Sequence, residues 1–110
     1  MTEPVITLEM TDKRHGRYVA RIDGVDGEGE ITLTRRGPHL ISADHTGVPE
    51  TMAGMGVGMK LIAFMLDDAR AHDFKIIPLC PYVRAQYARH PEWADLFTTQ
   101  PGEDPAPPKD

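Results

Sequence analysis

The chain has 110 residues and a mass of 12.2 kDa, which fits one domain whose core needs neither metals nor disulfides. Hydrophobic residues make up 40% and charged residues 26%, which disfavours a coiled coil or a wholly disordered chain. The net charge of −5 gives no general attraction to phosphates, so nucleic acid is not an expected partner.

The single cysteine, Cys80, excludes an internal disulfide and a multi-thiolate zinc site, and we expect no bound metal. No apolar run has the length of a membrane span, and the N-terminus lacks the apolar stretch of a signal peptide. These features predict a cytoplasmic domain that binds neither membranes nor nucleic acid.

Four segments in the first half of the chain alternate apolar and polar residues, which is the pattern of half-buried β-strands. Short polar turns separate them, so we expect an antiparallel meander. The four segments are Val5 to Met10, Arg17 to Asp23, Glu28 to Arg35 and His39 to His45.

The second half of the chain has a different period. Apolar residues recur at helical spacing from Gly56 to about His72, which predicts a long helix. The apolar run from Phe74 to Leu79 predicts a fifth strand, and Tyr82 to Arg89 a short helix. Because a helix crosses between strands four and five, these two strands can lie parallel. This order of four strands, a long helix, a fifth strand and a short helix predicts an α+β domain.

The last residues of the chain have a different composition from the rest. Residues 98–110 are rich in proline and acidic side chains and poor in groups that a core could bury. We therefore expect a folded domain over residues 1–97 and a disordered tail over residues 98–110.

A glycine-rich run, Gly54 to Lys60, opens the long helix. Its spacing matches neither a P-loop nor a dinucleotide-binding fingerprint. The simplest interpretation is a flexible helix start. Glycines between a strand and a helix also let backbone N–H groups face an anion at the positive end of the helix dipole, and this context favours a pyrophosphate site.

Cys80 follows the predicted fifth strand, and Pro81 after it suits the first position of a helix. A thiol at a helix N-terminus has more thiolate character than a free cysteine, but a lone cysteine is also commonly a small buried apolar residue. Both interpretations stay open for Cys80. Tyr87 on the short helix is best explained by packing, with a role as an acid as the alternative.

His45 ends the predicted fourth strand, next to the loop that leads to the glycines. Its intrinsic pKa near neutrality suits a general base. The alternative is a histidine that hydrogen-bonds the backbone at the end of a strand.

Taken together, four segments resemble the minimal, single-cysteine branch of the GNAT N-acetyltransferase superfamily. The resemblance covers roughly residues 5 to 97, and its most specific part is the Pro-Leu-Cys-Pro-Tyr sequence. The four segments are His45 to Pro49, Gly56 to Gly58, Pro78 to Val83 and Arg89 to Glu92. The resemblance implies a minimal GNAT fold and acetyl-coenzyme A (acetyl-CoA) as the ligand.

In this superfamily the parallel fourth and fifth strands splay apart, and the pantetheine arm of coenzyme A enters the gap. The resemblance therefore implies backbone contacts from Thr46, Gly47 and Val48. The superfamily's pyrophosphate loop falls on Ala53 to Gly58, where Ala53 replaces the usual Gln or Arg and Met55 replaces a frequent basic residue. The full set of implied cofactor-binding residues is Thr46, Gly47, Val48, Ala53, Gly54, Met55, Gly56, Val57, Gly58, Met59 and Cys80.

The implied activity is transfer of an acetyl group from acetyl-CoA to an amine of a small molecule or a protein. His45 is the candidate base, and Cys80 would protonate the leaving thiolate or carry the acetyl group. Tyr87 is a further candidate acid. The alternative is a module that binds acyl-CoA or a protein partner without turnover. The sequence identifies no acceptor, and it leaves the oligomeric state open, with a monomer as the simplest case.

Overall fold

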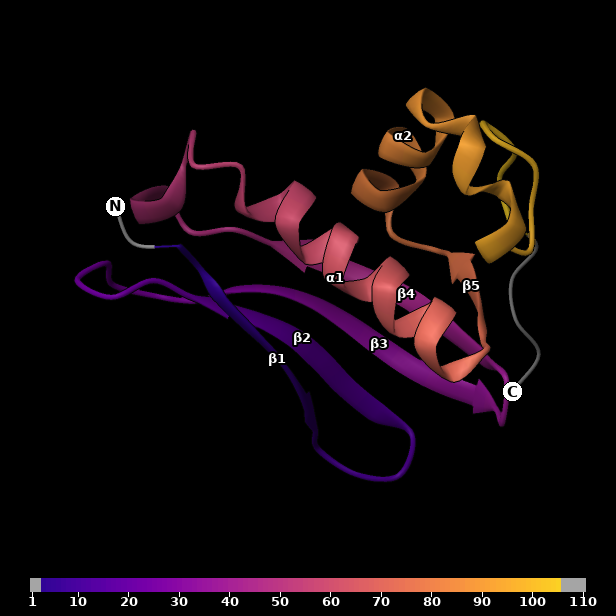
Figure 1. Ribbon diagram of the computed structural model, residues 1–110, viewed down its shortest axis with the longest axis horizontal. Helices are drawn as coiled ribbons and strands as arrows, with labels where there is room; N and C mark the ends of the chain where they lie inside the picture. The colour runs from indigo at the N-terminus through magenta and orange to yellow at the C-terminus, as the bar shows by residue number, and fades with distance from the viewer. Residues whose placement is uncertain (1–2, 106–110) are drawn as a thin grey trace.

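The computed structural model describes residues 3–105, which form one five-stranded sheet, two α-helices and two 3-10 turns (Figure 1). In chain order these elements are β1 (Val5–Met10), β2 (His15–Arg21), β3 (Gly29–Gly37), β4 (Leu40–Gly47), η1 (Glu50–Met52), α1 (Val57–His72), β5 (Lys75–Pro78), α2 (Pro81–Arg89) and η2 (Pro91–Leu96).

The strands lie in the sheet in their sequence order, β1-β2-β3-β4-β5. Strands β1 to β4 pair antiparallel, and β5 pairs parallel to β4. The long helix α1 makes the crossover that a parallel pair requires. The predicted α+β architecture, with a meander, a crossover helix and a parallel fifth strand, is confirmed.

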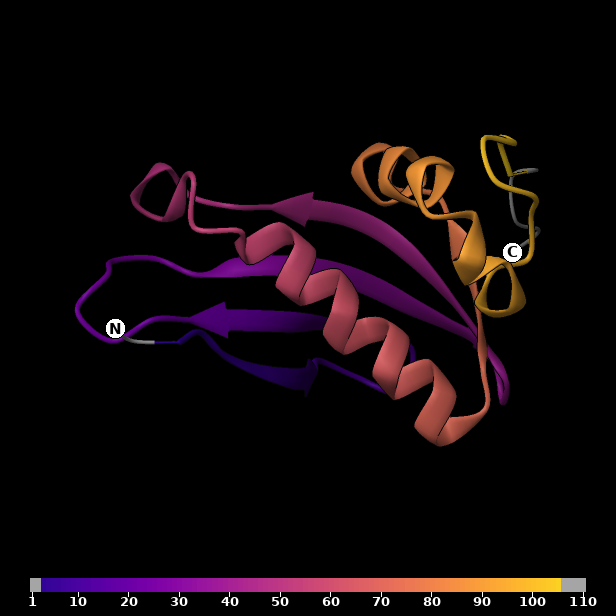
Figure 2. The same ribbon diagram turned by 45° about the horizontal axis from the view of Figure 1, so that its top comes forward.

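One face of the sheet forms the core. Alternate residues of the central strands point toward α1, among them Tyr18, Ile31 and Leu33, which are buried. The buried face of α1, with Leu61 and Met65 near its centre, covers them. Figure 2 shows α1 crossing this face of the sheet, with α2 next to it.

The opposite face of the sheet carries charged side chains. The guanidinium of Arg17 lies 2.8 Å from Glu30 and 3.2 Å from Glu9, and Arg21 lies 2.5 Å from Glu28. Successive side chains of a strand point to opposite faces of the sheet. Core residues therefore face α1 and charged residues lie on the other face, as the period of two predicts.

The main differences from the predicted boundaries lie in β2 and β4. Strand β2 starts at His15, two residues earlier than expected, because His15 pairs with Thr34 of β3. Strand β4 extends to Gly47 rather than ending at His45, because Gly47 pairs with Glu30. Glycines weaken the strand pattern in a sequence, but here the neighbouring strand β3 sets the length.

Part of the predicted tail, 98–110, makes contacts in the structure, whereas residues 106–110 lie outside the described residues. The backbone N–H of Thr98 donates to the carbonyl of Ile76 in β5, at 3.1 Å. The carbonyl of Thr99 accepts a hydrogen bond of 2.6 Å from α2. Two truncations test the boundary predicted after residue 97.

Removal of residues 101–110 is expected to change the free energy of unfolding by less than about 0.5 kcal/mol. Within residues 101–105, the ion pair with the domain is that between Arg84 and Asp104 at 2.9 Å, which is exposed at Asp104 and contributes little. Removal of residues 98–110 also deletes the hydrogen bonds made by the backbone of Thr98 and Thr99 and is expected to cost about 1–3 kcal/mol. Urea unfolding of both truncated chains measures the difference, and equal stabilities would contradict it.

Candidate functional site

The edge of β4 becomes free halfway along the strand. Its pairing with β5 ends at Ala43, opposite Pro78. The backbone N–H of Cys80 then donates to the carbonyl of Ala43 at 2.8 Å, and the chain turns away into α2. Strand β4 continues for four more residues, to Gly47. The two parallel neighbours therefore separate at this point, and the end of β4 extends beyond the end of β5.

A β-bulge coincides with this separation. Leu33 pairs with Ala43 and Thr32 pairs with His45, so Asp44 has no residue opposite it on β3. The carboxylate of Asp44 accepts a 2.6 Å hydrogen bond from the hydroxyl of Thr34. A bulge bends the strand and increases its local twist. Here it turns the last residues of β4 away from the line of β5.

The loop between β4 and α1 turns on glycines with left-handed backbone angles. Gly54 has φ of 77° and Gly56, the N-cap of α1, has φ of 72°. A side chain at either position would be strained. The first N–H groups of α1 have no partner within the helix, as at every helix N-terminus. They lie at the positive end of the helix dipole, which favours an anion there.

A pocket of about 380 Å³ lies between this loop, the end of β4 and the start of α2. No charged side chain lines it among the described residues. Its lining residues are Thr46, Val48, Met52, Ala53, Gly54, Gly56, Val57, Gly58 and Tyr82.

The pocket brings together most of the residues predicted to bind a cofactor, from two separate parts of the chain. Gly47, Met55 and Met59 are the predicted loop and strand residues that do not line it. Met55 is exposed instead, and Met59 packs against the core.

Two lining residues, Met52 and Tyr82, had no predicted role in the site. Met52 is buried beneath the loop, and its place in a 3-10 turn leaves no periodic signal. Tyr82 lies so close to Gly58 that a methyl group on Gly58 would be 2.5 Å from its hydroxyl oxygen. Glycine is therefore needed at residue 58 because α2 begins against α1. In the sequence, Pro81 followed by Tyr82 marks the start of α2, and this was the one local feature from which the contact with Gly58 could have been predicted.

Cys80 is the N-cap of α2, with Pro81 at the first helical position, and this part of the prediction is confirmed. Its thiol is 2% exposed. The sulfur lies 3.1 Å from the hydroxyl oxygen of Thr46, and Thr46 lines the pocket. The thiol is thus buried directly behind the wall that the end of β4 contributes to the pocket.

His45 is exposed and lies on the charged face of the sheet. A methyl group on Gly47 would lie 3.6 Å from the imidazole carbon Cε1 and 4.0 Å from Glu30, which places all three residues on one face. The next residue, Thr46, contacts Cys80 on the other face. His45 and Cys80 therefore lie on opposite faces of the free edge of β4.

Tyr87 lies in the core. It is fully buried, and its ring stacks on Phe97 with centroids 4.1 Å apart. Its hydroxyl donates to the carbonyl of Thr99 at 2.6 Å. Burial raises the pKa of this phenol, and the carboxylates of Glu103 and Asp95 raise it further. Tyr87 therefore packs in the core with its hydroxyl proton donated to the backbone, and its role as an acid stays a prediction.

The fold and the pocket together define the class of the protein. A meander followed by a crossover helix and a parallel fifth strand, with a glycine-turned helix start beside a free strand end, is the arrangement of the GNAT fold. The model of the GCN5-related N-acetyl-transferase family matches residues 17–96, and the chain belongs to this family.

A comparison with curated proteins gave no match. In the described part of the chain, neither helix combines the length and the apolar character that crossing a membrane requires.

Proposed function

We propose that this protein is an acetyl-CoA-dependent N-acetyltransferase. The observation that carries the proposal is the pocket between the left-handed glycine turns and the free end of β4. It joins a helix N-terminus suited to the pyrophosphate of coenzyme A with a strand edge suited to the adjacent, amide-containing pantetheine arm.

In this proposal the pyrophosphate of coenzyme A lies against the first turn of α1, at Gly56 to Gly58. The pantetheine arm runs along Thr46, Gly47 and Val48 and pairs with their backbone groups as an added strand would. Because no charged side chain among the described residues lines the pocket, backbone N–H groups supply the phosphate contacts. Lys60, the nearest basic residue in α1, is 2.5 Å from Glu3.

The proposed reaction places one group on each side of the thioester. His45, on the charged face, takes a proton from the amine, and the nitrogen attacks the carbonyl carbon. The carbon–sulfur bond then breaks, and the thiol of Cys80, on the other face, protonates the departing thiolate of coenzyme A. Solvent water then takes the proton from His45 and supplies one to the thiolate of Cys80, which returns both groups to their starting states. A route through acetyl-Cys80 ranks second, because the family resemblance favours direct transfer.

A second candidate function is a module that binds acyl-CoA, or a protein partner, without turnover. Ala53 favours it, because this position of the loop offers no charge to the phosphates. A panel of amines, each incubated with acetyl-CoA and the protein, separates the two functions by the release of free coenzyme A. Release that depends on an amine supports the transferase, whereas binding without release with any amine supports the module.

Acetyl-CoA is expected to stabilise the protein against heat. At a hundredfold excess over Kd, a ligand that binds only the folded state adds about 2.7 kcal/mol, which for a domain of this size raises Tm by roughly 10–20 °C. Pantetheine, which lacks the pyrophosphate, should give a smaller shift if the helix N-terminus binds phosphate. Ala53→Arg should add up to about 1 kcal/mol to coenzyme A binding at this exposed loop.

Thermal unfolding followed by fluorescence measures these shifts. An unmoved Tm at saturating acetyl-CoA, with the fold intact by circular dichroism, would remove the ligand from both candidate functions. Equal increases in Tm with coenzyme A and with pantetheine would instead support binding of the pantetheine arm and contradict a phosphate site at the glycine turns.

A further inference from the structure

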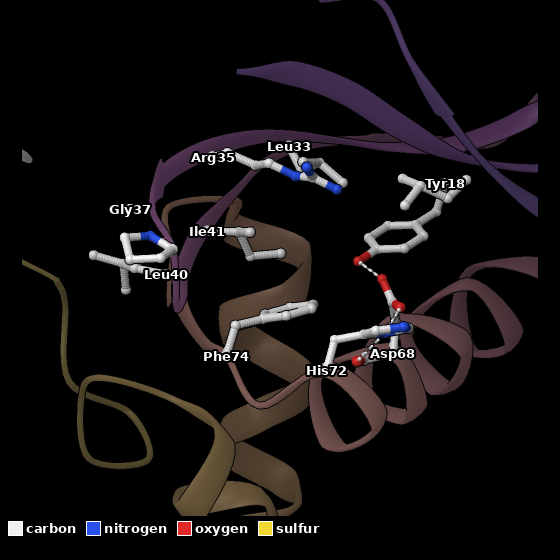
Figure 3. Close-up of a pocket in the computed structure, with 11 residues that line it drawn as sticks. Tyr18, Leu33, Arg35, Gly37, Leu40, Ile41, Asp68, His72 and Phe74 are labelled. Carbon is white, nitrogen blue, oxygen red and sulfur yellow. Dashed lines mark hydrogen bonds and ion pairs between the residues drawn. The ribbon is translucent and has the colours of Figure 1, made fainter. Parts of the chain in front are cut away.

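A second cavity lies at the far end of α1 from the glycine turns. It has a volume of about 320 Å³ and opens between the last turn of α1 and the turn that joins β3 to β4. Figure 3 shows its apolar part, where Leu33 and Ile41 of the sheet face Phe74. A cavity of this size suits a small organic molecule.

One wall of the cavity is a hydrogen-bonded chain of three side chains (Figure 3). The hydroxyl of Tyr18 donates to one carboxylate oxygen of Asp68 at 2.8 Å. The other oxygen of Asp68 is 2.8 Å from Nδ1 of His72. Burial and the bond to Asp68 raise the pKa of Tyr18, so its proton stays on the phenol. Asp68 is therefore held in place by two partners.

Arg35 brings a positive charge to the opposite wall. It continues the core-facing row of β3 after Ile31 and Leu33, and it pairs across the sheet with Ile41. Among the described residues 3–105, its guanidinium has no carboxylate at ion-pair distance. The cavity is therefore lined by one cation, Arg35, and by one carboxylate, Asp68, which is bound to Tyr18 and His72 and makes no ion pair with Arg35.

We propose that this cavity binds a small carboxylate with an apolar or aromatic body. The body would lie between Ile41 and Phe74, and the carboxylate would pair with Arg35, whose planar fork of N–H donors matches a carboxylate. Amphipathic ligands of this kind fit cavities in which one charged group accompanies an apolar lining. The site does not depend on the proposed acetyl transfer.

The cavity is distinct from the pocket at the glycine turns. The two share no lining residue. Asp68 follows Gly58 by ten residues along α1, a separation of about 15 Å at the rise of an α-helix. A ligand in the cavity would therefore perturb a different set of backbone amides from those that coenzyme A perturbs.

The test uses three carboxylates and their uncharged amides: phenylacetate, hexanoate and cyclohexanecarboxylate, each against its amide. Amide chemical shifts of the full chain are followed by NMR during titration at constant ionic strength. At least one carboxylate is expected to bind roughly three- to tenfold more tightly than its amide. The shifts should be confined to residues 33–41 and 68–74 and to the neighbours of Leu8 and Tyr18, which also line the cavity, with and without saturating acetyl-CoA.

Two variants assign the effect to the guanidinium. Arg35→Gln should abolish the difference between carboxylate and amide, and because Arg35 is exposed this variant should keep the wild-type Tm. Arg70→Gln removes an equal charge from the outer side of α1, where Arg70 pairs with Asp67, and should keep the difference. Equal binding of every acid and its amide, or shifts confined to residues 46–58, would overturn the proposal. So would the absence of saturable binding by all six probes.

Discussion

Replacement of Tyr87 by alanine is expected to destabilise the domain by about 3–5 kcal/mol, the cost of deleting a large buried aromatic side chain. The ring is fully buried and stacks on Phe97, so its removal leaves a cavity between α2 and the segment after η2. Tyr87→Phe keeps the ring and loses only the hydrogen bond to the carbonyl of Thr99. That variant is expected to cost about 1 kcal/mol.

Urea unfolding gives the two changes in stability, and the rate of transfer per folded molecule gives the catalytic effect. Tyr87→Phe should keep full activity, because its proton is committed to the backbone. Tyr82→Phe is a matched control. Its side chain is 36% exposed, so loss of that hydroxyl should leave stability unchanged. A Tyr87→Phe variant that is stable but about a hundredfold slower in transfer would support its role as an acid.

Much of the fold could be predicted from the sequence because local patterns determine it. The period of two in the meander and the period of 3.6 in α1 arise from residues that are near each other in the chain. The left-handed glycine at residue 56 and the proline at residue 81 likewise mark the two helix starts. These signals were enough to place Cys80 at the N-cap of α2.

The parts of the site that were missed depend on contacts between distant residues. The contact of Tyr82 with Gly58 exists only because α2 begins against α1. The bulge at Asp44 is a mismatch of register between β3 and β4, which one strand alone does not reveal. Arg35 in a core-facing row is a local irregularity, but its importance depends on where Asp68 and Tyr18 lie.

The face of β4 on which each proposed catalytic residue lies could not be predicted from the sequence either. His45 was predicted at the end of the fourth strand and Cys80 just after the fifth, and the structure places the two side chains on opposite sides of the free end of β4. The bulge makes this assignment hard to predict, because one extra residue changes which side chains share a face. A base and an acid on opposite sides of one strand edge suit a thioester that lies along that edge.

Cys80→Ala is expected to lower the rate of acetyl transfer by about a hundredfold or more, the usual contribution of a general acid, while acetyl-CoA still binds. The thiol lies 3.1 Å from the hydroxyl of Thr46, so a thioester along the end of β4 would pass next to it. Val83→Ala is the matched control, because it removes a buried side chain of α2 without touching the thiol. It should reduce stability but not the rate of transfer per folded molecule.

Alkylation by iodoacetamide tests the position of the thiol independently of activity. Acetyl-CoA bound beside Thr46, whose hydroxyl contacts the sulfur of Cys80, should slow the reaction severalfold by covering the thiol. Mass spectrometry after acetyl-CoA is added without an amine tests the covalent route, which predicts an acetyl group on Cys80. A thiol that reacts only in denaturant, in a protein whose Cys80→Ala variant keeps full transfer, would make Cys80 a packing residue. His45 would then carry the proton transfers with backbone N–H groups alone, and the reaction would need only one face of β4.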